Sequence, residues 1–368
     1  MNATWEKLPF LDVVNDVSSG NEKVPQTEYL KSGAYPVIDQ GKDLIAGYVN
    51  DERMLWKGEL PVVVFGDHTR NLKYIDFPFC IGADGVKVLS PKKGDARYLY
   101  HFLRSIKIES AGYSRHFKFL KEFDVVAPLE EKEQKRIATI LDQAESLRAK
   151  RRAALEQLDA LAQAIFIEMF GHPTRGPKDR KMVSLGELGA WRTGGTPPRS
   201  EQQHFEGDVP WFSSGELEGM YISESQEKIS KEALQKTSAK PVLAGSILIG
   251  MYDTAALKVS ISAIDCSCNQ AIAFSSLDEN LVDAVFVYFS ILIGREDYRR
   301  MQRGVRQQNL NLSMIRELKV PLPDVALQKK FLNRIETIRQ SRQVLLKQLK
   351  ELDNLFHSLQ HRAFRGEL

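Results

Sequence analysis

Residues Leu129–Phe170 read LEEKEQKRIATILDQAESLRAKRRAALEQLDALAQAIFIEMF, and this stretch decides the fold because it occurs twice. A shift of 194 residues places Pro323–Phe364 on top of it, with Arg148 falling on Arg342. Beyond its first residue neither copy contains glycine or proline, the residues that most often interrupt a helix. Each copy is therefore predicted to form one long helix.

Apolar residues recur every seven residues in both copies, and only three of the twenty seam positions are not apolar. A seven-residue apolar repeat is the seam of a coiled coil, so the two helices are predicted to pair with each other. A solvated helical spacer is the alternative, and the apolar stripe disfavours it. Arg148 and Arg342 are matched charges within the seam, and each is expected to reach a carboxylate or a backbone carbonyl. The seam positions are Ile137, Leu141, Ala144, Arg148, Arg151, Leu155, Leu158, Ala162, Ile165 and Met169 in the first copy and Phe331, Ile335, Ile338, Arg342, Leu345, Leu349, Leu352, Phe356, Leu359 and Ala363 in the second.

The regions around the helices read as two similar β-rich globules. Short apolar runs alternate with Gly, Asp and Asn in residues 1–127, with one helix expected at Ala96–Ile106, and residues 182–322 repeat this plan with a helix expected at Asp283–Leu292. The predicted class is α/β (α+β): an internal duplication in which globules alternate with the antiparallel helices, giving pseudo-two-fold symmetry. The predicted segments are 1–127, 128–170, a Gly/Pro/basic linker at 171–181, 182–322 and 323–368.

Composition limits the expected cellular location of the protein and the kind of surface it can offer to nucleic acid. The 368 residues carry a net charge of +3 and three cysteines, Cys80, Cys266 and Cys268, which form neither a disulfide framework nor a zinc-site pattern. No apolar run reaches the length of a membrane span, and the N-terminus lacks the order of a signal peptide. A cytoplasmic location without membrane contact is expected. Because Lys and Arg balance Asp and Glu in each globule, any nucleic-acid surface must come from local clustering.

Motifs of catalysis are not found in the sequence. There is no Walker loop, His-Glu-x-x-His or Gly-x-Ser-x-Gly, and Asp208-Val209-Pro210-Trp211 only poorly imitates the box of an amino-methyltransferase. The chain is therefore predicted not to be an enzyme and to hold neither a metal nor a cofactor.

Three kinds of stretch have the side chains that contact nucleic acids. Residues 65–73 place His, Thr, Arg, Asn and Lys after a predicted strand, although a polar hairpin tip would look the same. Residues 112–118 and 304–309 each put Arg and amide or imidazole donors after a Gly, just ahead of a long helix. In the second globule Gly194 and Gly195 allow close approach of the backbone to a ligand. Trp211 is more simply a core residue, and a solvated helix face accounts equally well for Arg295, Arg299 and Arg300.

The side chains predicted to contact DNA come from these stretches and from neighbouring loops. They are Lys42, His68, Thr69, Arg70, Asn71, Lys73, Ser114, Arg115, His116 and Lys118 in the first globule and Thr196, Arg199, Ser213, Ser214, Glu216, Tyr252, Asp253, Arg303, Arg306, Gln307 and Gln308 in the second.

The chain resembles the specificity subunit of type I restriction–modification enzymes. The resemblance covers nearly the whole sequence and rests on Gly-Asp-His-Thr-Arg at 66–70, Gly-Gly-Thr-Pro at 194–197, Val-Pro-Trp-Phe-Ser-Ser-Gly-Glu at 209–216 and a Pro and Gln ahead of each long helix. It implies that each globule is a target recognition domain and that the helices are the conserved regions that dock methyltransferase subunits. The first globule lacks Gly-Gly-Thr-Pro, so its contacts do not carry over from the second.

The resemblance also implies partners. These are double-stranded DNA carrying a bipartite, asymmetric target, two methyltransferase subunits that bind S-adenosylmethionine, and restriction subunits reached through the assembled complex. The helices carry more apolar surface than one pair would bury, which marks a protein interface. The residues expected to form it are Ile140, Leu147, Leu161, Val344 and Leu346, with Phe166, Ile167, Leu355 and Phe364 beside them.

Two other functions remain open from the residues alone. One is a diverged DNA methyltransferase or nuclease that acts by itself, which would bind S-adenosylmethionine or cut DNA when purified. The other is a coiled-coil adaptor without a nucleic-acid role, which would not retain DNA at low salt.

Overall fold

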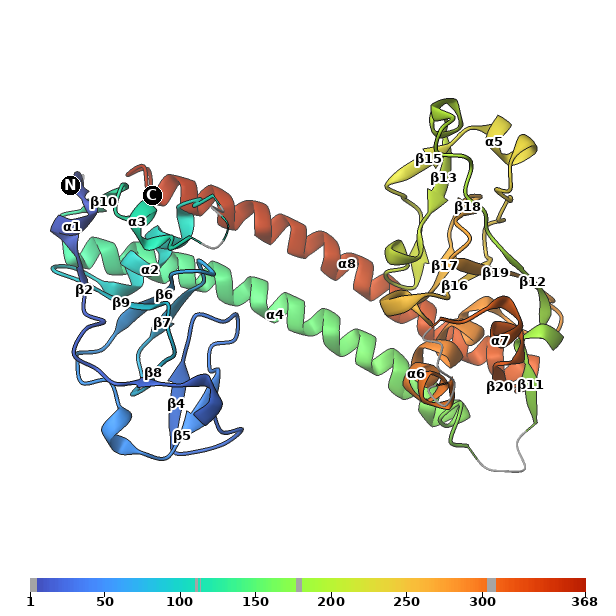
Figure 1. Ribbon diagram of the computed structural model, residues 1–368, viewed down its shortest axis with the longest axis horizontal. Coiled ribbons are helices and arrows are strands. Elements are labelled where there is room, and N and C mark those ends of the chain that lie inside the picture. The colour runs from blue at the N-terminus through green and yellow to red at the C-terminus, as the bar shows by residue number, and fades with distance from the viewer. Residues whose placement is uncertain (1–4, 110–111, 113, 177–180, 303–308) are drawn as a thin grey trace. The chain divides into compact units, whose positions relative to one another are not determined.

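The computed structural model describes residues 5–109, 112, 114–176, 181–302 and 309–368 (Figure 1). The chain divides into two compact units, the first made of Met1–Ala153 with Leu346–Leu368 and the second of Ala154–Leu345. Each unit combines one globule with a half of each long helix, α4 (Glu131–Phe170) and α8 (Val325–Ala363). In the described part of the chain no helix has an apolar stretch long enough to cross a membrane.

The globule of the first unit is built from three sheets. The order of strands is β2-β9-β6-β7 in one and β3-β8-β4-β5 in another, while β1 pairs with β10. The sheets are mainly antiparallel, but β8 is parallel to both of its neighbours. The elements are β1 (Trp5–Pro9), α1 (Phe10–Val13), β2 (Val14–Asp16), β3 (Lys23–Val24), η1 (Gln26–Glu28), β4 (Tyr35–Ile38), β5 (Gly47–Val49), η2 (Glu52–Met54), β6 (Val62–Gly66), β7 (Leu72–Ile75), β8 (Cys80–Gly82), β9 (Val86–Pro91), α2 (Ala96–Ser105), α3 (Phe117–Leu120) and β10 (Asp124–Pro128).

The globule of the second unit repeats this plan. The sheet β12-β19-β16-β17-β14 corresponds to β2-β9-β6-β7, the sheet β15-β13-β18 contains the same parallel pair as β4 and β8, and β11 pairs with β20 as β1 does with β10. The elements are β11 (Met182–Ser184), η3 (Leu185–Glu187), β12 (Gly189–Thr193), η4 (Gln202–Phe205), β13 (Val209–Phe212), η5 (Ser214–Glu216), β14 (Tyr221–Ile222), β15 (Glu227–Ile229), α5 (Lys231–Lys236), β16 (Ile247–Gly250), η6 (Asp253–Ala255), β17 (Val259–Ser262), β18 (Ser267–Cys268), β19 (Ile272–Leu277), α6 (Ala284–Gln302), α7 (Leu312–Glu317) and β20 (Lys319–Pro321).

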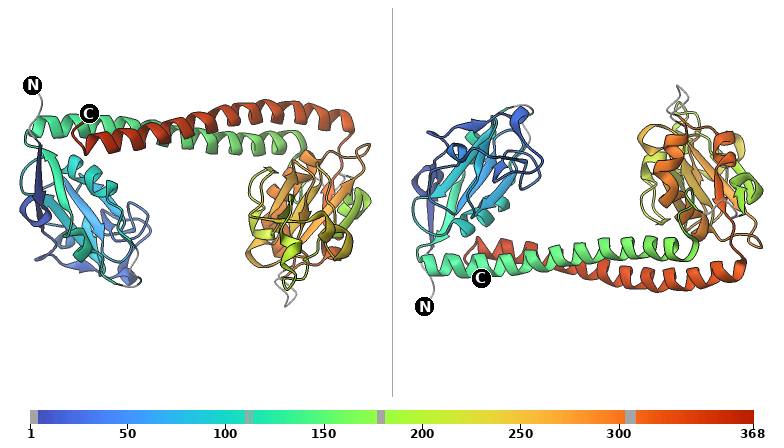
Figure 2. Two further views of the ribbon diagram at one scale, coloured as in Figure 1. Left: turned by 90° about the horizontal axis from the view of Figure 1, so that it is seen from above. Right: turned by 90° about the horizontal axis from the view of Figure 1, so that it is seen from below.

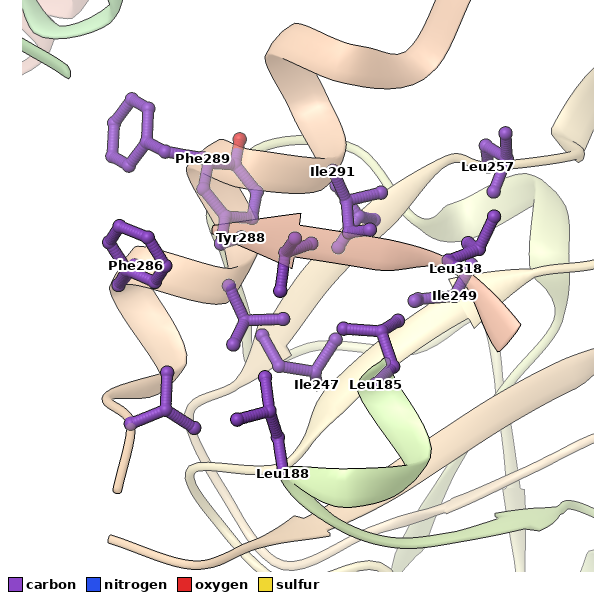
Figure 3. Close-up of a cluster of buried hydrophobic side chains, with 14 of the residues drawn as sticks. Leu185, Leu188, Ile247, Ile249, Leu257, Phe286, Tyr288, Phe289, Ile291 and Leu318 are labelled. Carbon is purple, nitrogen blue, oxygen red and sulfur yellow. The ribbon is translucent and has the colours of Figure 1, made fainter. Parts of the chain in front are cut away.

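Both predicted helices of the globules are present. The first, α2, ends one residue before the expected Ile106, and its apolar face is buried against the sheet. The second, α6, runs on to Gln302, well past the predicted end at Leu292, because Gly294 continues as part of the helix. Figure 3 shows the resulting core, in which Phe286 and Ile291 of α6 lie with Ile247 and Ile249 of β16.

Each long helix begins in the same way. The Gln134 side chain accepts a hydrogen bond from the Asp95 N–H at 2.8 Å and donates to the Pro128 carbonyl at 2.8 Å. Its matched residue Gln328 accepts from the Asp283 N–H at 3.0 Å and donates to the Pro323 carbonyl at 3.0 Å. A buried amide therefore ties the start of each long helix to the start of α2 or α6, which explains why this glutamine recurs in both copies.

Within each unit the local segments of α4 and α8 run antiparallel, side by side (Figure 2). In the first unit Arg148 Nε donates to Asp353 Oδ1 at 2.6 Å, and in the second Arg342 Nε donates to Asp159 Oδ1 at 3.0 Å. The same shift of 194 residues relates both partners of these ion pairs. The prediction that the two matched arginines of the seam reach a carboxylate is therefore confirmed.

The end of each long helix packs on a globule. Phe170 of α4 lies 5.0 Å from Phe286 of α6, and its matched residue Phe364 lies 5.3 Å from Phe102 of α2 (ring centroids). Gly171 then takes a left-handed φ of 71° and its N–H donates to the Ile167 carbonyl, which ends α4.

Two residues expected on the partner-binding face lie in the cores instead. Phe166 is fully buried, with Phe286 and Phe331 on either side, and Phe364 is half-buried against α2. Burying a side chain of this size contributes about 1.5–3 kcal/mol, so the cores of the globules outcompete an external partner for both rings.

Candidate nucleic-acid interface

The loop after β6 is closed by its own backbone. The Gly66 N–H donates to the Asn71 carbonyl at 2.8 Å, and the Arg70 N–H donates to the Gly66 carbonyl at 2.7 Å. Arg70 has a φ of 64°, the left-handed region that residues with a side chain rarely enter. A Cβ at Gly66 would come within 2.2 Å of the Thr69 hydroxyl, so this turn requires glycine there. The loop is a tight, preorganised turn.

Gln40, which follows β4, holds the same loop from the side. Its carbonyl accepts hydrogen bonds from the Thr69 hydroxyl and from Asn71 Nδ2, the latter at 2.9 Å. Its side-chain oxygen accepts from the His68 N–H at 3.2 Å. Because the hydroxyl of Thr69 and the amide of Asn71 are engaged here, they act first as anchors of the loop.

Asp67 brings two predicted stretches together. Its Oδ1 accepts a hydrogen bond from the Phe117 N–H at 2.7 Å, and its carbonyl accepts from the His116 N–H at 2.8 Å. Residues 65–73 and 112–118 were selected from the sequence separately, and the fold makes them neighbours. Asp67 belongs to the 66–70 motif, but its partners 49 and 50 residues away were not foreseen, and no sequence signal singled out Gln40.

Five of the predicted side chains of this unit are exposed, and four of them are long cations. Arg70 donates one N–H to the Ile108 carbonyl at 2.9 Å, and Lys118 lies over the Phe119 ring with its Nζ 4.7 Å from the centroid. We call the exposed set the first loop cluster: Lys42, Thr69, Arg70, Arg115 and Lys118. His68 and Ser114 are half-buried beside them.

Three residues from the predicted list are not surface donors in this fold. Lys73 is 5% exposed and its Nζ lies 3.4 Å from Asp39 Oδ1, and burial lowers the pKa of its ammonium group. His116 is 1% exposed and donates from Nδ1 to the Asp67 carbonyl. Lys73, His116 and Asn71 are therefore corrected to residues that stabilise the globule, because their polar atoms bond to other groups of the protein.

The Gly-Gly-Thr-Pro stretch of the second unit approaches its own backbone instead of an open surface. A Cβ on Gly194 would lie 2.2 Å from the Cys268 carbonyl oxygen, and one on Gly195 would lie 2.1 Å from that of Ser238. The Thr196 hydroxyl donates to Gln270 Oε1. The glycines are needed for close packing within the domain, which corrects their predicted role as a ligand-facing loop.

The polar residues near β13 are likewise committed to each other. Arg199 makes two hydrogen bonds to Glu227, at 2.9 and 2.7 Å, which raise the pKa of its guanidinium group, and it stacks on Phe205. Ser213 and Glu216 form a capping box around η5. Both motifs of the resemblance in this region therefore stabilise local structure, while exposed Arg199 and half-buried Ser213 and Glu216 remain predicted DNA contacts. Trp211 is buried, as its core interpretation predicts.

The remaining predicted residues of the second unit that the structure describes lie around the loop after β16. Tyr252 is half-buried and packs against the core, Asp253 begins η6, and Ser214 is half-buried in η5. Arg303, Arg306, Gln307 and Gln308 lie outside the described residues. Where the described chain resumes, the Leu310 N–H donates to the Met251 carbonyl at 2.8 Å, so Leu310 lies beside this loop.

The predicted partner-binding side chains are largely exposed. Leu147 and Leu346 of the first unit are 51% and 40% exposed, and Leu161 and Val344 of the second are 47% and 56% exposed. Ile140 is half-buried. Each unit therefore has apolar side chains of both long helices on its surface. The exposed set is called the apolar stripe: Leu147, Leu161, Val344 and Leu346.

The cysteines and the acidic side chains are the candidates for reactive or metal-binding groups. All three cysteines are buried, and burial raises the pKa of the Cys80 and Cys266 thiols to about 11, which suppresses the reactive thiolate. Within the described ranges no group of three or more His, Cys, Asp or Glu side chains is arranged to hold a metal ion.

A model of the family described as "Type I restriction modification DNA specificity domain" matches residues 2–157 and again 177–353. The chain is 24% identical to the Type I restriction enzyme EcoR124I/EcoR124II specificity subunit of Escherichia coli over 358 residues, which cover 91% of this chain and 88% of that protein. It is also 24% identical to the Type I restriction enzyme MjaIX specificity subunit of Methanocaldococcus jannaschii over 159 residues, covering 42% of this chain and 37% of that one.

Among solved structures, the S subunit of a Type-I restriction-modification system from M. genitalium superimposes with a TM-score of 0.62 at 15% identity, covering 99% of this chain and 96% of that chain. At this level of identity the similarity describes the fold.

Proposed function

The chain belongs to the family of type I restriction–modification DNA specificity domains, and from this premise we propose that its two units read the two halves of a bipartite, asymmetric DNA target. It is a type I restriction–modification specificity subunit, a non-catalytic component that binds DNA and assembles with the other subunits of the system. The proposal concerns how it does so and with which residues.

The observation that carries the proposal is the pair of hydrogen bonds from residues 116 and 117 to Asp67. These bonds gather Arg70, Arg115 and Lys118 from separate stretches at the edge of one globule. Exposed Arg and Lys side chains neutralise phosphates, and Arg also forms paired hydrogen bonds with guanine. The second globule has the same plan with different residues in its loops, which fits a target whose halves differ.

Alanine variants of Arg70 and Arg115 test this reading. Loss of an arginine that reads a base should cost about 1–3 kcal/mol and relax one position of the target. Loss of a phosphate contact should weaken all sequences alike and reduce the salt slope by about one unit. If both variants bind and direct methylation as the wild type does, the first loop cluster does not contact DNA. Arg306, outside the described residues, is proposed as the corresponding contact of the second unit.

The apolar stripe is proposed to dock methyltransferase subunits, one at each unit, in a 2:1 complex. An internal duplication offers two similar surfaces, and two similar surfaces bind two identical partners. The partners would bind S-adenosylmethionine and carry out methylation, and restriction subunits would join through them. Mass measurement of the co-purified complex tests the count, and a 1:1 complex would contradict it.

Sequencing of the methylome in cells with and without this gene tests the function itself. The expected difference is methylation at one asymmetric motif with two specific blocks and a spacer of constant length. A motif with one block, or methylation that does not depend on the gene, would refute the proposal. DNA cleavage or S-adenosylmethionine binding by the purified chain alone would favour a diverged enzyme instead.

A further inference from the structure

The loop after β16 in the second unit is closed by the same bonds as the loop after β6 in the first. The Leu257 N–H donates to the Gly250 carbonyl at 2.8 Å, as the Arg70 N–H does to the Gly66 carbonyl at 2.7 Å. Leu257 and Arg70 have φ values of 58° and 64°, and they are the non-glycine residues with left-handed backbone in the described parts of the chain. The two residues therefore occupy equivalent positions at the ends of equivalent loops.

The first residue of each loop confirms this equivalence. The Asp67 carbonyl accepts a hydrogen bond from the His116 N–H, and the Met251 carbonyl accepts one from the Leu310 N–H, both at 2.8 Å. In each unit the chain that follows α2 or α6 therefore returns to the loop at the same point. The backbone frame that supports the first loop cluster is present in both units.

The two loops differ in length and in the burial of their closing residue. Residues 67–69 lie between the closing residues of the first loop, and residues 251–256 lie between those of the second. The left-handed residue of the first loop, Arg70, is exposed, whereas Leu257 is fully buried in the core, near Leu318 (Figure 3). The longer loop is therefore anchored at its end by an apolar side chain, and of its described side chains that of Thr254 is exposed.

Two arginines of α6 hold the middle of the longer loop. Arg299 donates from Nη2 to the Ala256 carbonyl at 2.9 Å and to the Thr254 carbonyl at 3.2 Å, and from Nε to Ala256 at 3.2 Å. Arg295 Nη2 donates to the Ala256 carbonyl at 3.3 Å. Both side chains are half-buried, and burial lowers the pKa of Arg295. Their donors are directed into the protein, so neither a solvated helix face nor a phosphate contact describes them.

In the first unit an arginine also connects the loop to the chain near a helix, but there the arginine lies in the loop. There Arg70 belongs to the loop and donates to the carbonyl of Ile108, which follows α2. In both units an arginine links the loop to its neighbouring helix region. In the second unit the link also satisfies loop carbonyls of Thr254 and Ala256.

Building on the proposed function, we propose that residues 252–256 form the base-reading loop of the second unit and that Arg295 and Arg299 position it. Besides the predicted contacts Tyr252 and Asp253, the loop offers to a base edge the hydroxyl of exposed Thr254, which can donate and accept. The arginines fix the peptide that carries this hydroxyl, and base discrimination depends on such fixed geometry. They touch the loop and not the DNA.

The test uses the full chain co-expressed with its methyltransferase subunits, with the methylated motif read by sequencing. Arg299→Ala and Arg295→Ala should relax one or more positions in one block of the motif, with roughly tenfold loss of discrimination there, and leave the other block unchanged. Thr254→Val, which removes the hydroxyl and keeps the shape, should relax the same block. Arg300→Ala is the matched control: this arginine is exposed on the same helix and should leave the whole motif unchanged.

Three outcomes would overturn the inference: an unchanged motif in the two arginine variants and in Thr254→Val, an equal loss of methylation at all motifs, or relaxation of both blocks together. Arg299→Lys keeps the charge but cannot reach both carbonyls with a planar group, so it should relax the same block less than alanine does. Failure of the proposed function would look different, because the wild-type complex itself would then show no two-block motif.

Discussion

Arg148→Ala and Arg342→Ala make the same change at matched positions of the two long helices, and we expect their costs to differ severalfold. The Arg148 side chain is 11% exposed, bonds Asp353 at 2.6 Å and Glu145 at 2.7 Å, and lies 4.4 Å from the centroid of the Phe356 ring. Arg342 is 42% exposed and pairs with an Asp159 that is 55% exposed, at 3.0 Å. Burial is therefore what separates two otherwise equivalent ion pairs.

The magnitudes follow from that burial. A hydrogen bond to a charged group contributes about 1.5–3 kcal/mol, and a cation above an aromatic ring about 0.5–2 kcal/mol. Because Asp353 is 35% exposed, water screens part of this attraction, and we expect Arg148→Ala to cost roughly 2–3 kcal/mol. An exposed pair contributes about 0–1 kcal/mol, which is the expected cost of Arg342→Ala. Arg148→Met, which keeps the apolar stem, should recover part of the loss.

Native-state hydrogen exchange in the full chain is the appropriate measurement, because the two compact units need not unfold together. Exchange in peptides from residues 137–153 and 346–356 should report the opening of the first unit in Arg148→Ala. Peptides from 154–165 and 335–345 should change little in Arg342→Ala. Equal costs, or a larger cost at Arg342, would refute the argument that burial decides the strength of these pairs.

Four further outcomes are expected. Insertion of seven residues, one heptad, into both long helices should lengthen the spacer of the DNA motif and leave its blocks unchanged, because seven helical residues add about 10.5 Å, roughly three base pairs. An altered block with an unaltered spacer would contradict this. Leu161→Asp with Val344→Asp, both in the second unit, should release one of the two methyltransferase subunits while circular dichroism shows an intact fold. A complex of unchanged mass would count against the stripe. Lys73→Met should leave the DNA affinity measured by titration unchanged, because the Lys73 ammonium group is buried within the first globule. A loss of affinity equal to that of Arg115→Ala would show that Lys73 does contact DNA. His101 is buried, and burial lowers its pKa, so its contribution to stability is complete above the unfolded pKa of about 6.5 and is lost as the pH falls below it. In denaturation experiments below that pH, the free energy of unfolding of His101→Gln should therefore fall less steeply than that of the wild type. An equally steep fall would argue against this.

Several features of the protein were determined by sequence alone. The duplication and the two long helices followed from a heptad pattern and a constant shift, which also predicted that Arg148 and Arg342 reach a carboxylate or a backbone carbonyl. These features depend on periodicity along one helix and on its repetition, which are local and readable without a fold. The helix α2 followed in the same way, because its apolar residues recur at helical spacing.

The tertiary structure decided which polar side chains are available to a ligand. Lys73 and Arg199 have the composition of DNA contacts, but each meets a carboxylate of its own unit. The partners of the first loop cluster are distant in the chain: Gln40 lies 29 residues before Thr69, and Ile108 lies 38 residues after Arg70. Whether a donor faces water or a carbonyl is set by these long-range contacts, which no local pattern encodes. For the same reason, the clamp that Arg295 and Arg299 form on the second loop is visible only in the folded chain.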